Sequence, residues 1–469
     1  MSTSRTSTLK TLSIFSLIMI TVGSVDSIRN LPATAMFGSE LIFYFLIGAI
    51  CFLLPCALIT AELASNHPEH NGVYDWVKLA FGEHYGFFAI WLQWVENVIW
   101  YPTILAFVAG TLGYLISPDL AASKWFLTSV ILIAFWGATF LNLLGIQLSA
   151  LFSAICSIGG LFLPMAIIIL LGIIWIATGH HMQIHFSWHA LLPIHHDTNL
   201  WVSLTGIMLS FCGMEVAAVH AQDVKNPQRD FPIAMIASVA IIVVTLLLGS
   251  LAIAIVLPSA KISLVAGLMQ AFDAFFTTYH LHWMMPLVAM MLIIGGMGGV
   301  NNWIIAPVRG LLLAAKDGYL PRICQRENRH RAPAFLLITQ AVLVSGLATA
   351  FIFMPSVNGS YWLLTALASQ LYMIMYVMMF IAGVVLRKST RDPKAYRIPG
   401  GRWGIWLMAF LGTVAAVTTF IVGFIPPMGV DVGGQAHYEI LLSFGLAIML
   451  LPPLLIAFFG KAFFTSSES

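Results

Sequence analysis

The chain consists of long apolar runs separated by short polar segments. Twelve such runs recur between residues 11 and 460, and a helix of about 20 residues spans the roughly 30 Å of hydrocarbon in a bilayer. Because lipid cannot hydrogen-bond to an exposed backbone, segments that cross it are predicted to be helical. The predicted spans are 11–37, 41–64, 85–115, 125–145, 148–178, 200–221, 233–257, 283–308, 333–354, 360–386, 403–425 and 437–460.

Two of these runs contain a glycine and an acid near their middle. They are Gly23-Ser24-Val25-Asp26 in the first span and Gly213-Met214-Glu215 in the sixth. A charge at the bilayer centre costs at least about 2.5 kcal/mol, so it normally faces a cavity or a partner. Helix breaks at corresponding places in two halves of a chain indicate a transporter's binding site. We therefore expect Gly23 and Gly213 in non-helical backbone at mid-membrane depth, with substrate bound by the residues of both breaks.

Composition supports a membrane protein. The chain is 60% hydrophobic and 9% charged, whereas about a quarter of the residues of a soluble domain are charged. No cleavage site follows the first apolar run, so we expect that run to be a permanent span. Five cysteines lack metal-type CxxC spacing and are expected to be free thiols, and no metal or cofactor is predicted.

The basic residues predict an orientation. With the amino terminus inside, eighteen of the 21 Lys and Arg residues would face the cytoplasm, including clusters at 309–331 and 387–402. This asymmetry satisfies the positive-inside rule, and an even number of spans brings both termini to the cytoplasmic side. The net charge of +2 therefore gives no sign of nucleic-acid binding, and the basic loops are expected to face anionic lipid.

Histidines gather on the predicted outer side. Nine of the 14 fall there, and six of these lie between residues 180 and 196, in a segment without Lys or Arg. This loop is either simply solvated, or an acid-responsive surface that gains charge near pH 5, or a metal site.

Several motifs occur in order along the chain. Ser210-Phe-Cys-Gly-Met-Glu-Val-Ala-Ala-Val-His220 and Asn226-Pro-Gln-Arg-Asp-Phe-Pro-Ile-Ala-Met235 resemble the helix-six signature of the bacterial glutamate/GABA antiporter group, within the amino acid-polyamine-organocation (APC) superfamily. Further matches are Gly72-Val-Tyr-Asp-Trp76, Trp303-Ile-Ile-Ala-Pro-Val-Arg-Gly310, Leu320-Pro321, Arg397-Ile-Pro-Gly-Gly401 and Ile425-Pro-Pro427. The resemblance covers nearly the whole chain.

This resemblance implies an all-α membrane fold of twelve transmembrane helices. Two five-helix inverted repeats with discontinuous helices one and six (the LeuT-like, or APC, fold) would be followed by two extra helices. The expected parts are a cytoplasmic amino terminus at 1–10, repeats at 11–178 and 200–386, the His-rich extracytoplasmic loop at 179–199, a basic cytoplasmic loop at 387–402, helices eleven and twelve at 403–460, and a cytoplasmic tail at 461–469. Half-helix ends would bind the carboxylate and ammonium of an amino acid.

The chain also departs from the group it resembles. Arg29 stands where an aromatic residue is expected, Asp26 where an apolar residue is expected, and Gly299 where the exchangers carry an acid. Asp26 and Arg29 are three residues apart, so they could form an intrahelical ion pair. The other interpretation, which we adopt, is contact with the substrate or its gate.

Three further polar residues have two interpretations each. Glu215 is either a substrate or gating residue, or a helix cap. Glu96, within Trp94-Val-Glu-Asn-Val-Ile-Trp100, either pairs with a neighbouring helix or belongs to the transport pathway, and His220 is either a pathway residue or a satisfied bundle histidine.

The predicted function is amino acid transport by alternating access across the bacterial inner (plasma) membrane. Residues 283–312 contain no Ser or Thr, which argues against a sodium site there and favours antiport. Proton symport of an amino acid or amine through Asp26, Glu96, Glu215 or His220 is the alternative. A channel or receptor-like sensor is a more distant alternative, and no enzyme motif occurs. Neither the particular amino acid or amine nor the oligomeric state follows from the sequence.

Overall fold

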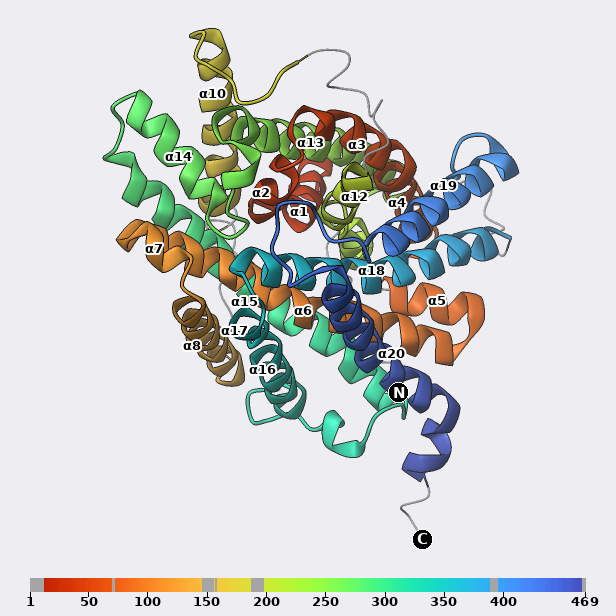
Figure 1. Cartoon of the computed structure of the whole chain (residues 1–469). Coiled ribbons are helices and arrows are strands. Elements are labelled where there is room, and N and C mark those ends of the chain that lie inside the picture. Colours follow the sequence, from red (N-terminus) through yellow and green to blue (C-terminus); the bar gives the residue numbers. More distant parts are fainter. Residues whose placement is uncertain are drawn as a thin grey trace.

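The protein is a bundle of helices (Figure 1). A computed structural model describes residues 12–69, 72–145, 156, 158–186, 198–388 and 395–465. Within these ranges the only pairing of β type is an isolated bridge between Leu12 and Val224. Twelve helical segments are long and apolar enough to cross a membrane, which confirms the predicted all-α class and number of spans. The inverted relation of the two five-helix repeats stays a prediction.

The first six spans include both interrupted helices. The first span, Ile14–Ala35, consists of α1 (Ile14–Val25), η1 (Ile28–Asn30) and α2 (Leu31–Ala35), and the second, Gly38–Asn66, of η2 (Gly38–Glu40), α3 (Leu41–Gly48), η3 (Ala49–Leu53) and α4 (Leu54–Asn66). The third and fourth are single helices, Glu83–Ile116 (α6) and Lys124–Leu143 (α8). The fifth, Ile158–Ala177, consists of η4 (Ile158–Phe162) and α10 (Leu163–Ala177), and the sixth, Trp201–Asp223, of most of α12 (Thr198–Ser210) and η5 (Met214–Asp223).

The other six spans are mostly single helices. They are Pro227–Val256 (α13), Met284–Lys316 (α15), Ala334–Phe353 (α16, Ala334–Ala348; α17, Ala350–Phe353), Val357–Arg387 (α18), Gly401–Val422 (α19) and Gln435–Ile456 (within α20, Gln435–Thr465). Three shorter helices connect spans: α5 (Val73–Phe81), α7 (Pro118–Ala121) and α14 (Gly267–Thr278).

The break in the sixth span falls where it was predicted. Helix α12 ends at Ser210, and Gly213 adopts φ +113° before the 3₁₀ helix η5 begins. This left-handed conformation strains any residue with a Cβ atom, which is why a glycine stands there. The prediction of non-helical backbone at Gly213 is confirmed.

The prediction for Gly23 is wrong. Gly23 lies inside α1, which continues to Val25, and the chain becomes extended at Asp26 and Ser27. Glycine weakens a helix but does not end one. The interruption coincides instead with Asp26, whose backbone N–H donates to the Val22 carbonyl at 2.7 Å and closes the helix, and η1 and α2 follow with Pro32 in the first turn of α2.

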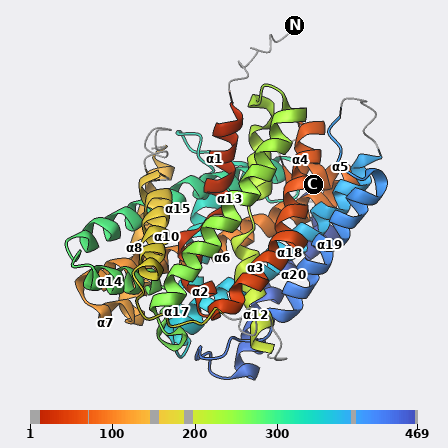
Figure 2. The same ribbon diagram turned by 90° about the horizontal axis from the view of Figure 1, so that it is seen from above.

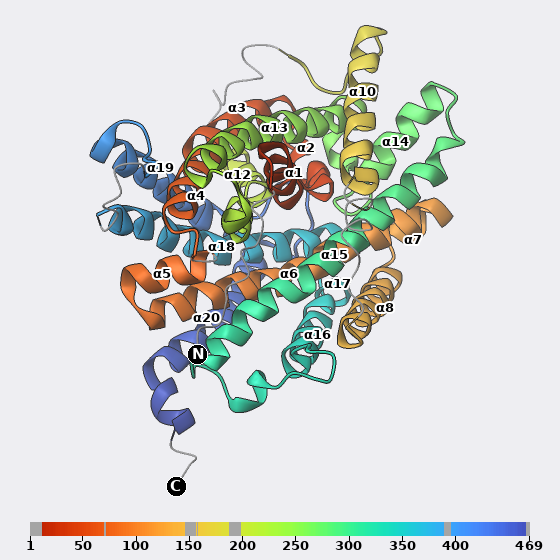
Figure 3. The same ribbon diagram turned by 180° about the vertical axis from the view of Figure 1, so that it is seen from behind.

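The interrupted helices lie in the middle of the bundle. Helices α6, α15 and α18 cross its centre and contact one another through α6, with α8 and α16 on one flank (Figures 1 and 3). On the other side α13 contacts α1, α4 and α10, and Figure 2 shows α13 running between α10 and α4. Both breaks are therefore enclosed by helices from the two sides of the bundle.

One end of the bundle collects the basic loops, and we call it the basic end. There, Lys78 of α5 lies 2.8 Å from a carboxylate oxygen of Asp317, and Arg387 lies 3.3 Å from Glu62. The backbone N–H of Leu12 donates to Asp223 at the same end. The start of α1 and most cationic loops thus share one side, as the charge pattern predicts, although the cytoplasmic assignment of that side remains a prediction.

Two regions extend beyond the sequence prediction. Helix α14 between the seventh and eighth spans was not predicted, and α15 continues to Lys316 instead of ending at 308. Most of 148–157 lies outside the described residues, as do residues 187–197 of the His-rich loop. Of that loop's described histidines, His180 stacks on Trp175, with ring centroids 4.6 Å apart.

Candidate substrate site

A cavity of about 150 Å³ lies between the two helix breaks. Helix α1 and the extended residues after it supply one wall, and α6 and α15 supply the opposite walls. The residues at and after the end of α12, η4 and Tyr372 of α18 complete the lining. The polar or small residues lining it are Gly23, Ser24, Asp26, Ser27, Arg29, Asn30, Glu96, Asn97, Cys156, Gly160, Cys212, Gly213, Gly295, Gly296, Gly299 and Tyr372.

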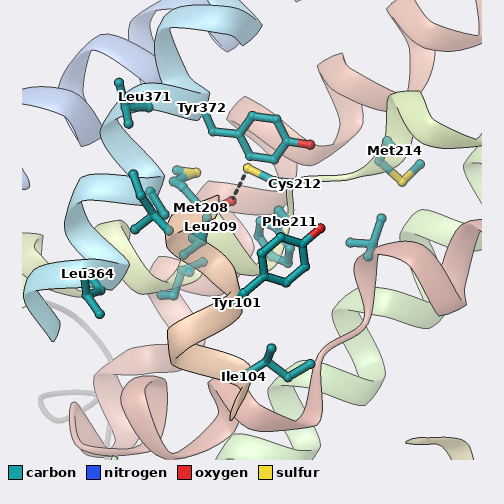
Figure 4. Close-up of a cluster of buried hydrophobic side chains, with 14 of the residues drawn as sticks. Tyr101, Ile104, Met208, Leu209, Phe211, Cys212, Met214, Leu364, Leu371 and Tyr372 are labelled. Carbon is teal, nitrogen blue, oxygen red and sulfur yellow. Dashed lines mark hydrogen bonds between the residues drawn. The ribbon is translucent and has the colours of Figure 1, made fainter. Parts of the chain in front are cut away.

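The second break lies against the last turn of α1, just before the first break. A Cβ atom on Gly213 would lie 3.0 Å from the Ser24 carbonyl oxygen, so a side chain there would press on the end of α1. Figure 4 shows Cys212 at the end of α12 with Tyr372 from α18 and Tyr101 from α6 near it, and the Cys212 thiol donates to the Met208 carbonyl at 3.2 Å. The end of α12 is thus packed among aromatic side chains of helices that are distant in sequence.

A tyrosine of α18 anchors that break. The Tyr376 hydroxyl accepts a hydrogen bond from the Gly213 N–H at 2.7 Å and donates to the carboxylate of Glu215. The Tyr372 hydroxyl donates to the other Glu215 oxygen at 2.7 Å. Glu215 is only 1% exposed, so water cannot hydrogen-bond to its carboxylate. The two tyrosine hydroxyls donate the hydrogen bonds that water would otherwise donate.

Asp26 ends the first half-helix and has one free oxygen. Its Oδ2 accepts a hydrogen bond from Thr245 of α13 at 2.8 Å, and the side chain is buried at the cavity wall. Oδ1 has no hydrogen-bond partner among the described residues. A buried oxygen without a donor is a site at which an ammonium group would be stabilised.

Arg29 is held by groups other than Asp26. Its Nη1 donates to Thr103 at 2.8 Å and to Tyr361 at 3.1 Å, and its guanidinium carbon lies 5.3 Å from the ring centroid of Trp100. No Asp26–Arg29 ion pair occurs within 4.0 Å, although both residues belong to the described part. The intrahelical pair considered from their spacing is therefore absent, because Asp26 ends one helix and Arg29 belongs to the next.

Glu96 lines the same cavity from α6. The side chain is 4% exposed, and within the described ranges its carboxylate forms no direct hydrogen bond or ion pair. Arg29 and Glu215 are close enough to act on it electrostatically. Glu96 thus lines the cavity and, among the described residues, shows no pairing with a neighbouring helix. Its role in the transport pathway stays a prediction.

A second cavity of about 740 Å³ lies on the basic-end side of the first. Residues of α5, α6, η5 and α15 line it, among them Tyr74, Gln93, Glu215 and Arg309. Trp303 lines both cavities, and the Tyr101 hydroxyl donates to its backbone carbonyl at 2.8 Å. The two spaces are therefore neighbours that share one aromatic residue.

The structure places the predicted site residues in four different surroundings. Gly23, Ser24, Val25, Asp26, Arg29, Glu96 and Gly213 line the first cavity, whereas Glu215 lines the second. Met214 is fully buried beside the break. His220 lines neither cavity and instead lies 3.9 Å from Asp223 near the end of η5, with 41% of its side chain exposed.

The sequence reasoning missed the partners of these residues. Thr245, Thr103, Tyr361, Tyr372 and Tyr376 hold the charged groups from helices that are distant in sequence. One signal was available, because Tyr372 and Tyr376 are four residues apart and so share a helix face. Across the part of the chain that the structure describes, no group of three or more His, Cys, Asp or Glu residues could hold a metal ion.

A twelve-span bundle whose two broken helices meet at a polar cavity has the form of a membrane transporter. The chain belongs to the amino acid permease family, whose sequence model matches residues 12–446. This agrees with the resemblance to the APC superfamily.

Several curated transporters are similar to this chain over most of its length. The chain is 43% identical to an uncharacterized transporter of Legionella pneumophila, with 96% of this chain and 97% of that protein covered. It is 28% identical to a glutamate/gamma-aminobutyrate antiporter of Lactococcus lactis (95% and 90% covered). It is 22% identical to a probable agmatine/putrescine antiporter of Lactococcus lactis (88% of each chain covered).

Proposed function

We propose that this protein exchanges an amino acid for another amino acid, or for its amine, by alternating access across the bacterial inner membrane, with both termini cytoplasmic. The observation that carries the proposal is the meeting of the two interrupted helices at a buried polar cavity. Broken helices expose half-helix ends, which bind carboxylates at their N-termini and cations at their C-termini. The antiporter relatives support exchange.

Asp26 and Arg29 have complementary roles in this proposal. The free Oδ1 of Asp26 accepts the ammonium group of the substrate. Nη1 of Arg29 is held by Thr103 and Tyr361. The remaining N–H groups of Arg29 point toward the carboxylate of the substrate or toward the outer vestibule. Both groups line the same cavity, so a zwitterion can satisfy them together.

The second cavity is the exit path in the same proposal. It continues from the shared residue Trp303 to Tyr74 and Arg309 near the basic end. Glu215 lines this cavity and is tied to the break through Tyr376. In this proposal Glu215 gates the exit path, because a change in the Gly213 backbone would disturb the hydrogen bond between Tyr376 and Glu215.

Proteoliposome counterflow tests the exchange. Vesicles loaded with excess unlabelled amino acid should take up labelled amino acid transiently above equilibrium, while empty vesicles should take up little. A screen of amino acids and amines by thermal shift identifies the pair to use, because a ligand that binds only the folded state stabilises it. Saturable uptake into empty vesicles that follows an imposed proton gradient would favour instead the symport alternative, for which the cavity acids Asp26 and Glu96 are the candidate proton carriers.

A further inference from the structure

A basic pocket lies away from the two cavities, where α18 ends and α19 begins. Its volume is about 710 Å³, and its lining includes Arg387, Lys388, Arg397, Arg402 and Trp406. The segment 387–402 carries six basic residues and one acid, Asp392, which lies outside the described residues. The pocket therefore concentrates positive charge at the basic end of the bundle.

One carboxylate of the described residues offsets part of this charge. Glu62 of α4 lies 3.3 Å from Arg387 and accepts the Ile398 N–H at 2.7 Å. Lys388, Arg397 and Arg402 are exposed at the rim. With four bases around the pocket and Glu62 beneath them, the pocket retains a positive potential that suits an anion.

An apolar groove adjoins this pocket. It has a volume of about 650 Å³ and is lined by Leu54 and Leu58 of α4, Ile236 of α13 and Leu407 of α19, with Ile398 and Pro399 shared with the basic pocket. Figure 3 shows α19 beside α4 and α18. The groove thus runs along outer surfaces of spanning helices, directly from the charged pocket.

Two tryptophans mark the boundary between the pocket and the groove. Trp403 lines the groove and is 85% exposed, while Trp406 lines the pocket and is 47% exposed. Exposed tryptophans on spanning helices are typical of the headgroup level of a bilayer. The two tryptophans therefore favour headgroup depth for the pocket and for the adjoining end of the groove.

We propose that this pocket and groove bind one anionic phospholipid, with its phosphate among Lys388, Arg397 and Arg402 and an acyl chain along Leu58, Ile236 and Leu407. Charge complementarity selects an anion, and the adjoining apolar groove selects a lipid over a free phosphate. Neither half of the surface alone specifies this ligand.

The bound lipid would brace helices that carry the transport site. Asn66 of α4 donates to the Tyr396 carbonyl at 2.9 Å, and Gln228 of α13 donates to the Ser65 carbonyl at 2.7 Å. The same Gln228 accepts the Tyr396 N–H. A lipid held by the segment 396–402 therefore stabilises the junction of α4 and α13, and α13 provides the Thr245 partner of Asp26.

Native mass spectrometry of the full chain in detergent tests the proposal. The probes are dioleoylphosphatidylglycerol and dioleoylphosphatidylcholine, with glycerol 1-phosphate as a soluble competitor. We expect one tightly bound phosphatidylglycerol per chain. Removing three charges (Lys388→Gln, Arg397→Gln and Arg402→Gln together) should weaken its binding roughly 100-fold, since each base near a membrane surface contributes about a factor of five.

The matched control removes three exposed bases from another loop of the basic end, Lys316→Gln with Arg326→Gln and Arg329→Gln, and should bind phosphatidylglycerol as the parent does. If the pocket variant fails to fold, Arg402→Gln alone should weaken binding about fivefold. The proposal is overturned by unchanged binding in the folded pocket variants, by equal binding of phosphatidylcholine, or by displacement of the lipid with glycerol 1-phosphate. Because the readout is lipid binding, its outcome is independent of whether the protein exchanges amino acids.

Discussion

The Tyr376 hydroxyl lies 2.7 Å from the backbone nitrogen of Gly213, so a side chain of α18 holds the backbone at the break of the sixth span. The same hydroxyl donates to Glu215. A buried N–H at a helix break needs an acceptor, and here it receives one that also binds the nearest acid. Backbone conformation and the position of Glu215 are thereby linked.

Tyr376→Phe should destabilise the protein by about 1–3 kcal/mol, because it leaves the buried Gly213 N–H without its acceptor. It should also slow counterflow. Tyr372→Phe is the matched control, since it removes one donor from Glu215 and leaves Gly213 bonded. Thermal melting and counterflow of both variants give the comparison. Equal melting temperatures for the two variants would show that the Gly213 contact contributes nothing.

Alanine should have opposite effects at the two glycines. Gly213→Ala places a Cβ at φ +113° and 3.0 Å from the Ser24 oxygen, and the left-handed conformation alone costs about 1–2 kcal/mol. Gly23→Ala lies inside α1 with Phe162 at 3.9 Å, so it should gain roughly 0.5–1 kcal/mol from helix propensity. Melting temperatures of the two variants decide this, and a loss of stability at position 23 equal to that at 213 would contradict the assigned end of α1.

Glu215→Gln should abolish counterflow or change its pH profile while leaving the protein folded. The amide keeps an oxygen that can accept a bond from Tyr372 or Tyr376, so packing is preserved although the charge is lost. Counterflow is measured across pH and folding by size-exclusion profile, with Glu83→Gln, at an exposed acid outside both cavities, as the control. A wild-type rate and pH profile would exclude a gating role.

Neutralising Asp26 and Arg29 should abolish transport. Because the two side chains form no ion pair and have different partners, the effects of Asp26→Asn and Arg29→Gln on stability should add in the double variant. The double variant should fold and fail in counterflow. Recovery of stability in the double variant would instead reveal a structural pair, and near wild-type transport would leave the substrate role without support.

Stability at the basic end should fall in alkali. The hydrogen bond to Asp317 raises the pKa of Lys78 above its ordinary 10.5, and burial together with Asp317 raises the pKa of Tyr74 above 10.0. A raised pKa stabilises the folded protein below the ordinary value, and this contribution is lost as pH rises through the raised value. Asp317→Asn should therefore lower the melting temperature at pH 8, and the difference should shrink toward pH 11. The effect is small, about 0.2–1 kcal/mol for an exposed pair, and a constant difference across pH would contradict it.

The sequence was sufficient for the spans and for one break, but not for the contacts that hold the site. At Gly213 the glycine adopts a conformation that other residues avoid, so its identity carried the information. At Gly23 the same residue type is an ordinary helix residue, and the chain departs from the helix only at Asp26 and Ser27. Glycine alone therefore does not locate a break.

The partners of the charged groups depend on tertiary packing. Thr245 is 219 residues from Asp26, and Tyr361 is 332 residues from Arg29. Hydrophobic periodicity predicts which segments are helices but not which helix faces meet. The absence of an Asp26–Arg29 pair has the same origin, because three-residue spacing implies proximity only within one continuous helix.

Trp303 borders both cavities. In the proposed exchange this placement would let different residues select the charge and the length of the substrate. If the protein exchanges amino acids as proposed, the charged groups of the substrate meet Asp26, Arg29 and Glu96, which line only the smaller cavity. In the same proposal the length of the substrate is limited by the indole ring of Trp303, which lines both cavities. A descendant of this chain could therefore come to accept a longer molecule through a single substitution at Trp303 while its recognition of charged ends stayed the same.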